Sequence, residues 1–482
     1  MPRTELKTIT TDIPARLDRL PWSRWHLRIL IGLGTVWILD GLEVTVVGNV
    51  TTRLAEPGSG IAITDAQASG TGAALYVLGA CVGALFFGYL TDRLGRKKLF
   101  MITLAVYLAA TACTGLATEA WMFFVFRFLT GAGIGGEYAA INSAVDELIP
   151  TQHRGRIDII INGTFWLGAV GGSLLSIPAL NTALFPVDVG WRLTFGLGLV
   201  LGLVILLVRR SVPESPRWLF IHGREEEAER IVRGIEETVQ RETGGELAPA
   251  KGEITIRQRH SIGFGEIAGT MFRSYPKRAV LGFSLFIGQA FLYNAITFGY
   301  ATILATFFGV PSGSTGYYYA VIAVGNFVGP LVLSRFFDTW GRRPMISGTY
   351  LLSGAILLAT AWLFNAGALT AATLTACWCV ALFFASAGAS SAYLTVSEVF
   401  PMETRALAIA FFYAIGTAAG GISGPLLFAA MVETGNPFDT ALAFTIGALL
   451  MMAAGIVAIF LGVRAERKSL EDIAAPLTRQ DG

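Results

Sequence analysis

Runs of apolar residues separated by short polar connectors fill most of this chain of 482 residues. Each run is about 20 residues or longer, which is the length that a helix needs to cross the hydrocarbon core of a bilayer. Lipid offers no partners for backbone hydrogen bonds, and a helix satisfies its own, so each run is predicted to be a helix. The twelve predicted membrane helices are 28–50, 69–91, 98–117, 121–144, 158–181, 190–209, 279–308, 315–337, 344–364, 369–396, 405–432 and 439–463.

The composition also indicates a membrane protein. Hydrophobic residues make up 53% of the chain, charged residues make up only 15%, and the mean hydropathy is +0.59. A soluble protein carries about a quarter charged residues, so a soluble globular class is excluded. The net charge of +2 says little by itself, because the information lies in where the charges fall.

Basic residues are concentrated on one side of the predicted helices. They cluster near the N-terminus, between the second and third helices, in the middle linker and in the tail, whereas the opposite side carries only Arg53 and Arg192. The positive-inside rule therefore predicts that both termini are cytoplasmic. We expect an integral protein of the plasma membrane, which in a bacterium is the inner membrane. The leader lacks a cleavage-site pattern, so no cleaved signal peptide is predicted.

Two stretches of the first half return in the second half. GYLTDRLGRKK (88–98) returns as SRFFDTWGRRP (334–344), and ELIPTQHRG (147–155) returns as EVFPMETRA (398–406). Both offsets are about 250 residues, which indicates a duplication of half the chain. In membrane proteins, parallel repeats with a ligand site between them are typical of transporters. The predicted fold is therefore an all-α membrane protein with twelve transmembrane helices in two six-helix bundles.

The predicted divisions follow from this duplication and from one long polar linker. GREEEAERIVRGIEETVQRE (223–242) in this linker predicts an amphipathic helix with a narrow apolar seam at Ile231, Val232 and Ile235. The divisions are a cytoplasmic N-terminal segment (1–27), an N-terminal bundle (28–209), a cytoplasmic linker (210–277), a C-terminal bundle (278–463) and a cytoplasmic tail (464–482).

The chain offers no motif for enzyme chemistry. The glycines of GAGIGG (131–136) lie inside a predicted membrane helix, where they favour close helix packing over nucleotide binding. The four cysteines also lie in apolar runs and are predicted to be unpaired core residues. We therefore expect no enzyme activity, no cofactor, no metal and no nucleic acid.

Four ionisable residues fall inside predicted membrane helices of the first half, namely Asp40, Glu43, Arg127 and Glu137. Charge in hydrocarbon is costly, so these residues are candidates for function. Asp40 and Glu43 share one helix face, and Glu43 lies at a depth where it could meet Arg127. A carboxylate beside an arginine can bind or release a proton according to solvent access, so all four are proton-coupling candidates. The alternative is a permanent ion pair between two helices, with Glu137 serving helix packing.

The repeated motifs also predict a gate on the cytoplasmic side. Each copy offers an aspartate at a helix end, a loop arginine, a glutamate, and an arginine seven residues after that glutamate. A carboxylate there can accept amide hydrogens from the start of a neighbouring helix and can pair with the arginines. Such a network would be intact when this side is closed and broken when it opens. The predicted gate residues are Asp92, Arg96, Glu147, Arg154, Asp338, Arg342, Glu398 and Arg405.

Four motifs together resemble a known family. They are the doubled loop of the DRxGRK type, RFLTGAGIGGEY (127–138), PESPRWL (213–219), and SEVFP with its following arginine (397–405). Over essentially its whole length the chain resembles major facilitator superfamily transporters, and in particular the sugar-porter and metabolite:proton symporter branches. Glu43 and Arg127 stand at the acid and arginine positions of sugar porters, so the resemblance implies that this pair binds the proton. DGLE with GGEY also resembles phosphate:proton and organic-acid:proton symporters and synaptic-vesicle-protein relatives.

The resemblance implies a substrate site held mainly by the second half. Gln289, Asn294 and Asn326 match sugar-porter positions, whereas Gly288 and Tyr393 differ from the glutamine and tryptophan of that family. Aromatic residues suit stacking on a sugar ring or on an organic acid. The substrate candidates are Gln289, Asn294, Asn326, Tyr393, Trp166 and Tyr300.

The expected function is proton-coupled symport of a small organic metabolite, an organic acid or a sugar-like solute, by alternating access. Proton-driven export or antiport is an alternative, although the fifth predicted helix lacks the proline of the usual antiporter pattern. Facilitated uniport is another alternative, and nutrient sensing is a remote one because the tail is short. The expected partners are a small-molecule substrate, protons and the bilayer, and we expect a monomer.

Overall fold

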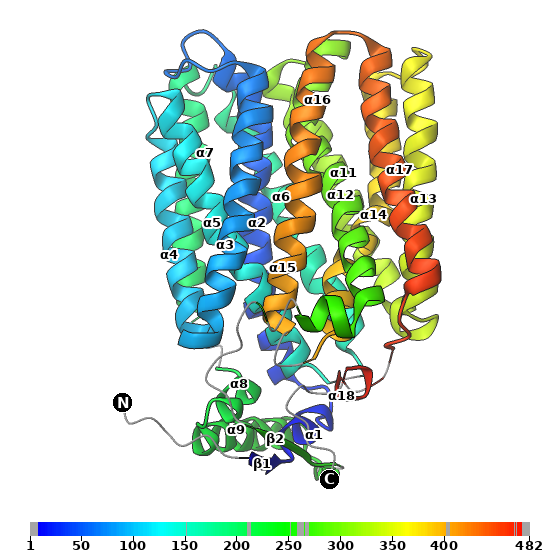
Figure 1. Ribbon diagram of the computed structural model, residues 1–482. Helices are drawn as coiled ribbons and strands as arrows, with labels where there is room; N and C mark the ends of the chain where they lie inside the picture. The colour runs from blue at the N-terminus through cyan, green and yellow to red at the C-terminus, as the bar shows by residue number, and fades with distance from the viewer. Residues whose placement is uncertain are drawn as a thin grey trace.

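The computed structural model describes residues 8–150, 152–209, 214–250, 252–257, 265, 269–401, 405–466, 468 and 470–474. Within these residues, twelve long helical segments form two bundles that stand side by side (Figure 1). The N-terminal bundle contains α2 (Arg24–Ala55), η1 (Gln67–Gly72) continued by α3 (Ala73–Leu94), α4 (Arg96–Gly115), α5 (Ala120–Leu148), α6 (Arg154–Ala179) and α7 (Val187–Arg209). The C-terminal bundle contains α11 (Pro276–Phe308), α12 (Thr315–Thr339), α13 (Arg342–Asn365), α14 (Ala371–Val399), α15 (Arg405–Thr417) continued by η4 (Ala418–Ile422) and α16 (Ser423–Glu433), and α17 (Pro437–Leu461).

The prediction of twelve membrane helices is confirmed. Ten of the helical segments in the described part of the chain are long and apolar enough to span a membrane, and α5 and α7 complete the set with 29 and 23 residues. Most helices extend a few residues beyond the apolar runs, as α2 does by beginning at Arg24. A helix continues through the polar interface to its capping residues, so the apolar run marks its membrane core and not its ends.

Glycines set how closely the helices of the N-terminal bundle approach. A methyl group added at Gly131 would overlap the carbonyl oxygen of Tyr76, and one added at Gly135 would overlap that of Ala80. Both glycines lie on α5 and face α3, so the two backbones touch where any side chain would separate them. The GAGIGG stretch therefore serves close helix packing, as its position in an apolar run predicted.

Five elements form a cap at one end of the two bundles (Figure 1). The helix α18 (Leu470–Ile473), near the C-terminus, lies at the same end, and we call this end the termini side. The predicted amphipathic helix is α9 (Glu225–Thr243). Its seam is wider than predicted, because Ala228 and Val239 are buried together with Val232 and Ile235, while Ile231 is only partly buried. The other elements of the cap are β1 (Thr8–Thr11), α1 (Ile13–Asp18), α8 (Pro216–Ile221) and β2 (Ile254–Arg257).

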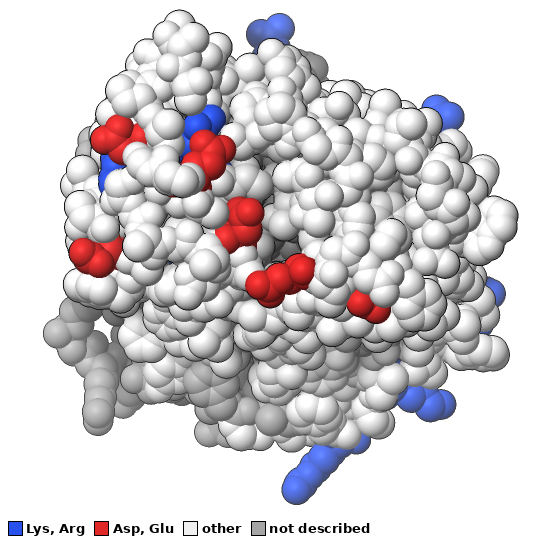
Figure 2. All heavy atoms as spheres, turned by 90° about the horizontal axis from the view of Figure 1, so that it is seen from above, with Lys and Arg blue, Asp and Glu red and all other residues white. Residues whose placement is uncertain are grey.

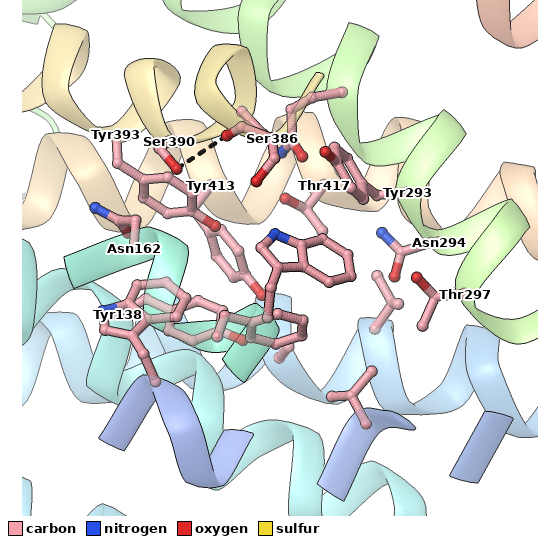
Figure 3. Close-up of a pocket in the computed structure, with 18 of the residues that line it drawn as sticks. Tyr138, Asn162, Tyr293, Asn294, Thr297, Ser386, Ser390, Tyr393, Tyr413 and Thr417 are labelled. Carbon is pink, nitrogen blue, oxygen red and sulfur yellow. Dashed lines mark hydrogen bonds between the residues drawn. The ribbon is translucent and has the colours of Figure 1, made fainter. Parts of the chain in front are cut away.

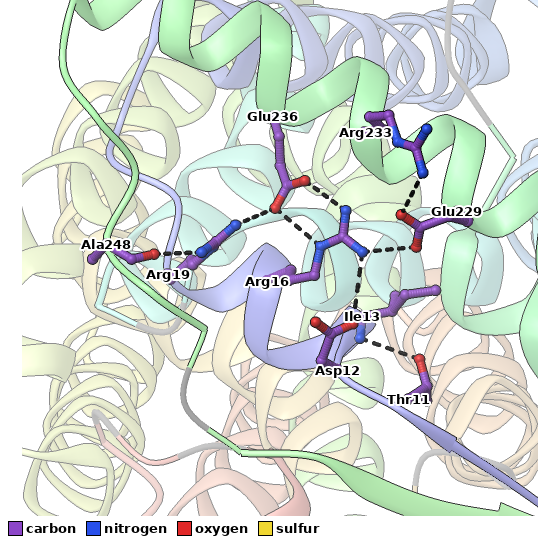
Figure 4. Close-up of polar contacts among 9 residues, drawn as sticks. All are labelled: Thr11, Asp12, Ile13, Arg16, Arg19, Glu229, Arg233, Glu236 and Ala248. Atoms are coloured by element: carbon purple, nitrogen blue, oxygen red, sulfur yellow. Dashed lines mark hydrogen bonds and ion pairs between the residues drawn. The ribbon is translucent and has the colours of Figure 1, made fainter.

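The N-terminal segment is folded onto α9, which the sequence did not predict. Strand β1 pairs antiparallel with β2, and Arg16 of α1 binds Glu229 at 2.7 Å and Glu236 at 2.6 Å (Figure 4). Arg19 approaches the same Glu236 at 2.5 Å. The cap is therefore held by a small apolar core and by ion pairs at its edge.

The face opposite the termini side, which we call the far face, is acidic. Figure 2 shows Asp and Glu side chains scattered over it, with few Lys and Arg side chains among them. Its basic residues Arg53 and Arg192 are bound to backbone carbonyls, at 2.7 Å from Leu180 O and 3.0 Å from Gly115 O respectively. The described acidic residues of the far-side connectors and helix ends are Glu56, Asp65, Glu119, Asp188, Glu433 and Asp439.

Candidate functional site

A cavity of ≈ 130 Å³ lies between the two bundles (Figure 3). An apolar cavity of about 150 Å³ holds one benzene ring, so this volume suits a solute of about one ring. Both halves of the chain contribute to its wall. The lining residues are Trp37, Val44, Tyr76, Val77, Ala80, Tyr138, Asn162, Phe165, Trp166, Gln289, Tyr293, Asn294, Thr297, Ser386, Ala389, Ser390, Tyr393, Tyr413 and Thr417.

Most polar groups of the cavity wall come from the second half of the chain. Four of the six predicted substrate residues, from both halves, belong to this wall. Gln289, Asn294, Tyr393 and Trp166 line the cavity. The amide of Gln289 has no hydrogen-bond partner among the described residues, so its donors and acceptor are available to a solute. The sequence did not single out the small polar residues around it, because serine and threonine are common in membrane helices. They are Thr297, Ser386, Ser390 and Thr417, with Asn162 from the first half.

The other two substrate candidates do not line the cavity. Asn326 is fully buried behind Tyr293, whose hydroxyl donates to Asn326 Oδ1 at 3.0 Å. Tyr300 is also fully buried, where it stacks on Tyr319 and its hydroxyl donates to Asn49. Both residues lie behind the wall of this cavity instead of forming it, and their contact with the solute stays a prediction.

An aromatic cluster joins the two bundles on the termini side of the cavity. Trp37 of α2 stacks on Tyr138 of α5, with ring centroids 4.6 Å apart and an angle of 8° between the planes. Tyr138 in turn meets Tyr413 of α15 edge-on at 5.0 Å, and Trp37 meets Tyr393 of α14 at 5.9 Å. All four rings form part of the cavity wall. Trp37 and Tyr138 were missed, although Tyr138 directly follows the predicted Glu137.

The structure brings Glu43 and Arg127 together. Glu43 Oε1 lies 2.5 Å from Arg127 Nη1, and both side chains are almost completely buried. The guanidinium also lies over the ring of Tyr76, 4.6 Å from its centroid. Tyr76 lines the cavity, as does Val44 beside Glu43. The ion pair is therefore one side chain removed from the solute space. Glu43 Oε2 has no hydrogen-bond partner among the described residues.

Asp40 and Glu137 are buried in the same bundle, but the ion pair described above joins Arg127 to Glu43. Asp40 is 1% exposed on α2, three residues before Glu43. Glu137 accepts a hydrogen bond of 3.4 Å from Thr103 of α4. Of the two neighbouring acids on α2, only Glu43 forms a salt bridge with Arg127 among the described contacts.

The C-terminal copy of the predicted gate is assembled around Arg342. Its guanidinium binds Glu398 through two bonds of 2.8 and 3.0 Å, and Asp338 through one of 2.8 Å. It also donates to Phe337 O at 2.8 Å. Two buried carboxylates therefore fix a single buried arginine at the termini-side end of the C-terminal bundle.

This cluster touches the N-terminal bundle at the start of α6. The amide of Arg156 donates to Asp338 Oδ2 at 2.9 Å, so the aspartate accepts from the N-terminus of a helix in the other bundle. The adjacent Gly155 faces the guanidinium of Arg342, and a methyl group there would lie within 2.5 Å of Arg342 Cζ. The bundles are thus in direct contact on the termini side.

The remaining gate residues divide into two groups. Arg154 does not join the Arg342 cluster; it binds Asp18 of the cap at 3.1 Å, and Arg217 lies 3.7 Å from the same carboxylate. The side chains of Asp92, Arg96, Glu147 and Arg405 lie outside the described residues.

The bundles also meet on the far side of the cavity. A methyl group at Gly48 of α2 would lie 2.5 Å from Thr297 O of α11, and Ser312 donates to Glu56 at 2.7 Å. The cavity therefore lies between two levels at which the bundles touch.

Comparison with protein families matches residues 30–476 to the model described as "Sugar (and other) transporter". The chain belongs to this family. The family places it within the major facilitator superfamily, so the chain is an integral membrane transporter of a small molecule and not an enzyme.

Curated relatives are similar over most of their length. The niacin transporter NiaP of Acinetobacter baylyi is 26% identical over 462 residues, which cover 96% of this chain and 99% of the relative. The inner membrane metabolite transport protein YgcS of Escherichia coli is 27% identical over 419 residues, or 86% and 87% of the two chains. Among solved structures, the proton:xylose symporter XylE bound to 6-bromo-6-deoxy-D-glucose has a TM-score of 0.75 at 18% identity, covering 93% of this chain and 98% of that chain. This likeness confirms the fold.

Proposed function

We propose that this transporter is a proton-coupled symporter of a small metabolite, with Glu43 as the protonation site and Arg127 as its switchable partner. The buried 2.5 Å contact between these two residues beside the cavity carries the proposal. An isolated buried charge is strongly unfavourable, so the protonation state of Glu43 depends on where Arg127 lies and on whether water reaches the carboxylate.

The geometry supports coupling between proton and solute. When Glu43 is ionised, Arg127 is neutralised by the pair, as seen here. When Glu43 is protonated, Arg127 retains the face of Tyr76 as a compensating partner through a cation–π contact. Because Tyr76 also lines the cavity, a change in the pair reaches the solute space through one ring. Protonation and solute occupancy thus bias the same group of side chains.

The wall of the cavity favours an uncharged solute. None of its described lining residues is Lys, Arg, His, Asp or Glu. An organic anion would lose its hydration there without gaining a cationic partner, whereas neutral hydroxyl or amide groups can bind Gln289, Asn294 and Ser386. We therefore propose a neutral ring-sized solute, such as a sugar-like molecule, in preference to an organic acid in its charged form.

Transport by Glu43→Gln in proteoliposomes tests the proton site. Accumulation driven by a proton gradient should vanish, while exchange of labelled solute across the membrane should persist, because glutamine can still accept a hydrogen bond from Arg127 but cannot titrate. Asp439→Asn is the matched control, since it removes a carboxylate from the far-side start of α17. It should retain accumulation.

Three outcomes contradict this assignment. If Asp40→Asn abolishes accumulation and Glu43→Gln does not, the proton carrier is Asp40. If neither variant matters and wild type accumulates nothing against a gradient, the protein is a uniporter. If solute leaves vesicles against its own gradient as protons enter, it is an antiporter.

Matched solute pairs test the proposed charge preference. Nicotinamide and nicotinate share one ring and differ in charge, as do xylose and xylonate. Binding is measured by the shift in unfolding temperature of the purified protein. The neutral member of a pair should give the larger shift, and a larger shift with the anion in both pairs would refute the preference.

A further inference from the structure

A groove of ≈ 490 Å³ lies on the termini side of the C-terminal bundle, outside the solute cavity. It is formed where α12 ends, α13 begins and α17 ends. This is the level at which membrane helices pass from hydrocarbon to lipid headgroups. The groove residues are Trp340, Arg343, Pro344, Ser347, Ile459, Arg464 and Glu466.

The groove contains two basic side chains that the protein does not neutralise. Among the described residues, neither Arg343 nor Arg464 is in an ion pair. Their two segments are in contact, because a methyl group at Gly462 would lie 3.0 Å from Arg343 Cγ. The one acid of the groove, Glu466, accepts from the amide of Arg342 at 3.3 Å. Its carboxylate is thus occupied at the start of α13, and the groove has an excess of positive charge.

The same groove opens onto lipid-facing apolar side chains. The groove residue Trp340 is 67% exposed, and its ring packs on Phe336 with centroids 4.5 Å apart. The groove residue Ile459 is also exposed, and Ile456 and Phe460 lie exposed near it on α17, with Phe460 74% exposed. Tryptophan prefers the interface of a bilayer, where its ring is apolar and its N–H group is wet.

We propose that this groove binds an anionic phospholipid, with the headgroup phosphate between Arg343 and Arg464 and an acyl chain along Ile456, Ile459 and Phe460. The two unpaired arginines can donate charge-assisted hydrogen bonds to the phosphate, and the exposed apolar side chains can pack against the acyl chains of the lipid. A free phosphate would use only the first of these features. The positive-inside rule places this site in the cytoplasmic leaflet, where basic clusters attract anionic lipids.

The position of the groove connects lipid to the gate. Arg343 directly follows Arg342, and Glu466 holds the amide of Arg342. A bound phosphate would hold the start of α13 in place, and with it the arginine that binds Asp338 and Glu398. Two interfacial arginines should give roughly a thirtyfold preference for anionic over zwitterionic lipid at low salt.

The test measures the unfolding temperature of the full-length purified protein in mixed micelles of detergent with phosphatidylglycerol or phosphatidylcholine. Wild type should be stabilised more by phosphatidylglycerol. The double variant Arg343→Gln with Arg464→Gln should lose this difference, and the double lysine variant at the same positions should largely keep it. Arg233→Gln with Arg241→Gln is the matched control, because it removes two exposed arginines from α9 and should keep the full difference.

The proposal is overturned if wild type shows no difference between the two lipids, or if the α9 control loses the difference as well, since the attraction would then be diffuse. Inorganic phosphate added without lipid should give no shift that depends on Arg343 and Arg464. If it gives the same shift as phosphatidylglycerol, the groove is a site for a soluble anion and the lipid assignment is wrong.

Discussion

Substitution of Gly155 by alanine should open the termini side of this transporter. The added methyl group would lie within 2.5 Å of Arg342 Cζ, where ordinary contact needs about 3.5–4.0 Å. One of the two groups must therefore move by about 1 Å or more. Arg342 cannot yield easily, because Glu398, Asp338 and Phe337 O all bind its guanidinium. The start of α6 should move instead.

The cost of this movement can be estimated from one hydrogen bond. Moving α6 away breaks the 2.9 Å bond from the amide of Arg156 to Asp338. A hydrogen bond to a charged group is worth about 1.5–3 kcal/mol. This bond exists only while the bundles touch on the termini side, so its loss penalises the closed state alone. At about 1.4 kcal/mol per factor of ten, the equilibrium should shift about ten- to a hundredfold towards opening on this side.

Hydrogen–deuterium exchange measured by mass spectrometry reads this shift. Peptides from the start of α6 and the end of α14 should exchange faster in Gly155→Ala than in wild type. Gly348→Ala is the matched control, because it lies on α13 and a methyl group there meets nothing within 4 Å. Its exchange pattern should equal that of wild type.

Two results would refute this reasoning. If Gly155→Ala exchanges no faster than Gly348→Ala at these peptides, the Gly155–Arg342 contact does not control closure. If exchange rises equally throughout both bundles, the substitution destabilises the whole fold and has no specific effect on the gate.

Three further predictions each concern a single polar side chain. Gln289→Ala should weaken solute binding by about 1–3 kcal/mol in a titration, and unchanged affinity would move the site elsewhere. Burial and the nearby Glu56 raise the pKa of Asp65 to about 6. The folded protein therefore holds this proton more tightly than the unfolded chain and loses stability as pH rises through about 4–6. Asp65→Asn should raise the unfolding temperature at about pH 7 and have less effect at about pH 4, and an equal gain at both would exclude titration of Asp65. Burial opposes ionisation of Glu236, yet its bonds from the cap arginines keep its pKa lowered. Glu236→Gln should speed exchange in α1 at neutral pH, whereas the exposed Glu237→Gln should not.

The membrane explains why the helices could be predicted from the sequence. Each of the twelve apolar runs forms a helix, because lipid offers no partners for backbone hydrogen bonds and a helix satisfies these bonds internally. The strand pair of the cap had no such signal. Strand β1 has four residues, and Thr8 pairs with Arg257, which lies more than half of the chain away in sequence. Its position depends on tertiary contacts that no local pattern carries.

The site was predictable where charge made the pattern unambiguous. Glu43 and Arg127 stand out because ionisable groups in hydrocarbon are rare and costly, and the structure brings them together. Asn326 and Tyr300 were assigned by spacing along a helix. Spacing gives the face of a helix but not whether another side chain stands in front, and Tyr293 stands in front of Asn326. Side chains from neighbouring helices therefore determine whether such a residue lines the cavity.

The packing of the N-terminal bundle indicates how the ion pair can act on the gate. Methyl groups at Gly41 and Gly168 would overlap backbone carbonyls across the α2–α6 contact, so these two helices cannot slide or separate without losing that contact. Glycines fix α3 against α5 in the same way. Glu43 belongs to the first pair of helices and Arg127 to the second, so their bond is a joint between two tightly packed units. Because α6 also begins beside Asp338, we propose that a change of charge at this joint alters the tilt of α2 with α6, and thereby the position of Arg156 relative to Asp338.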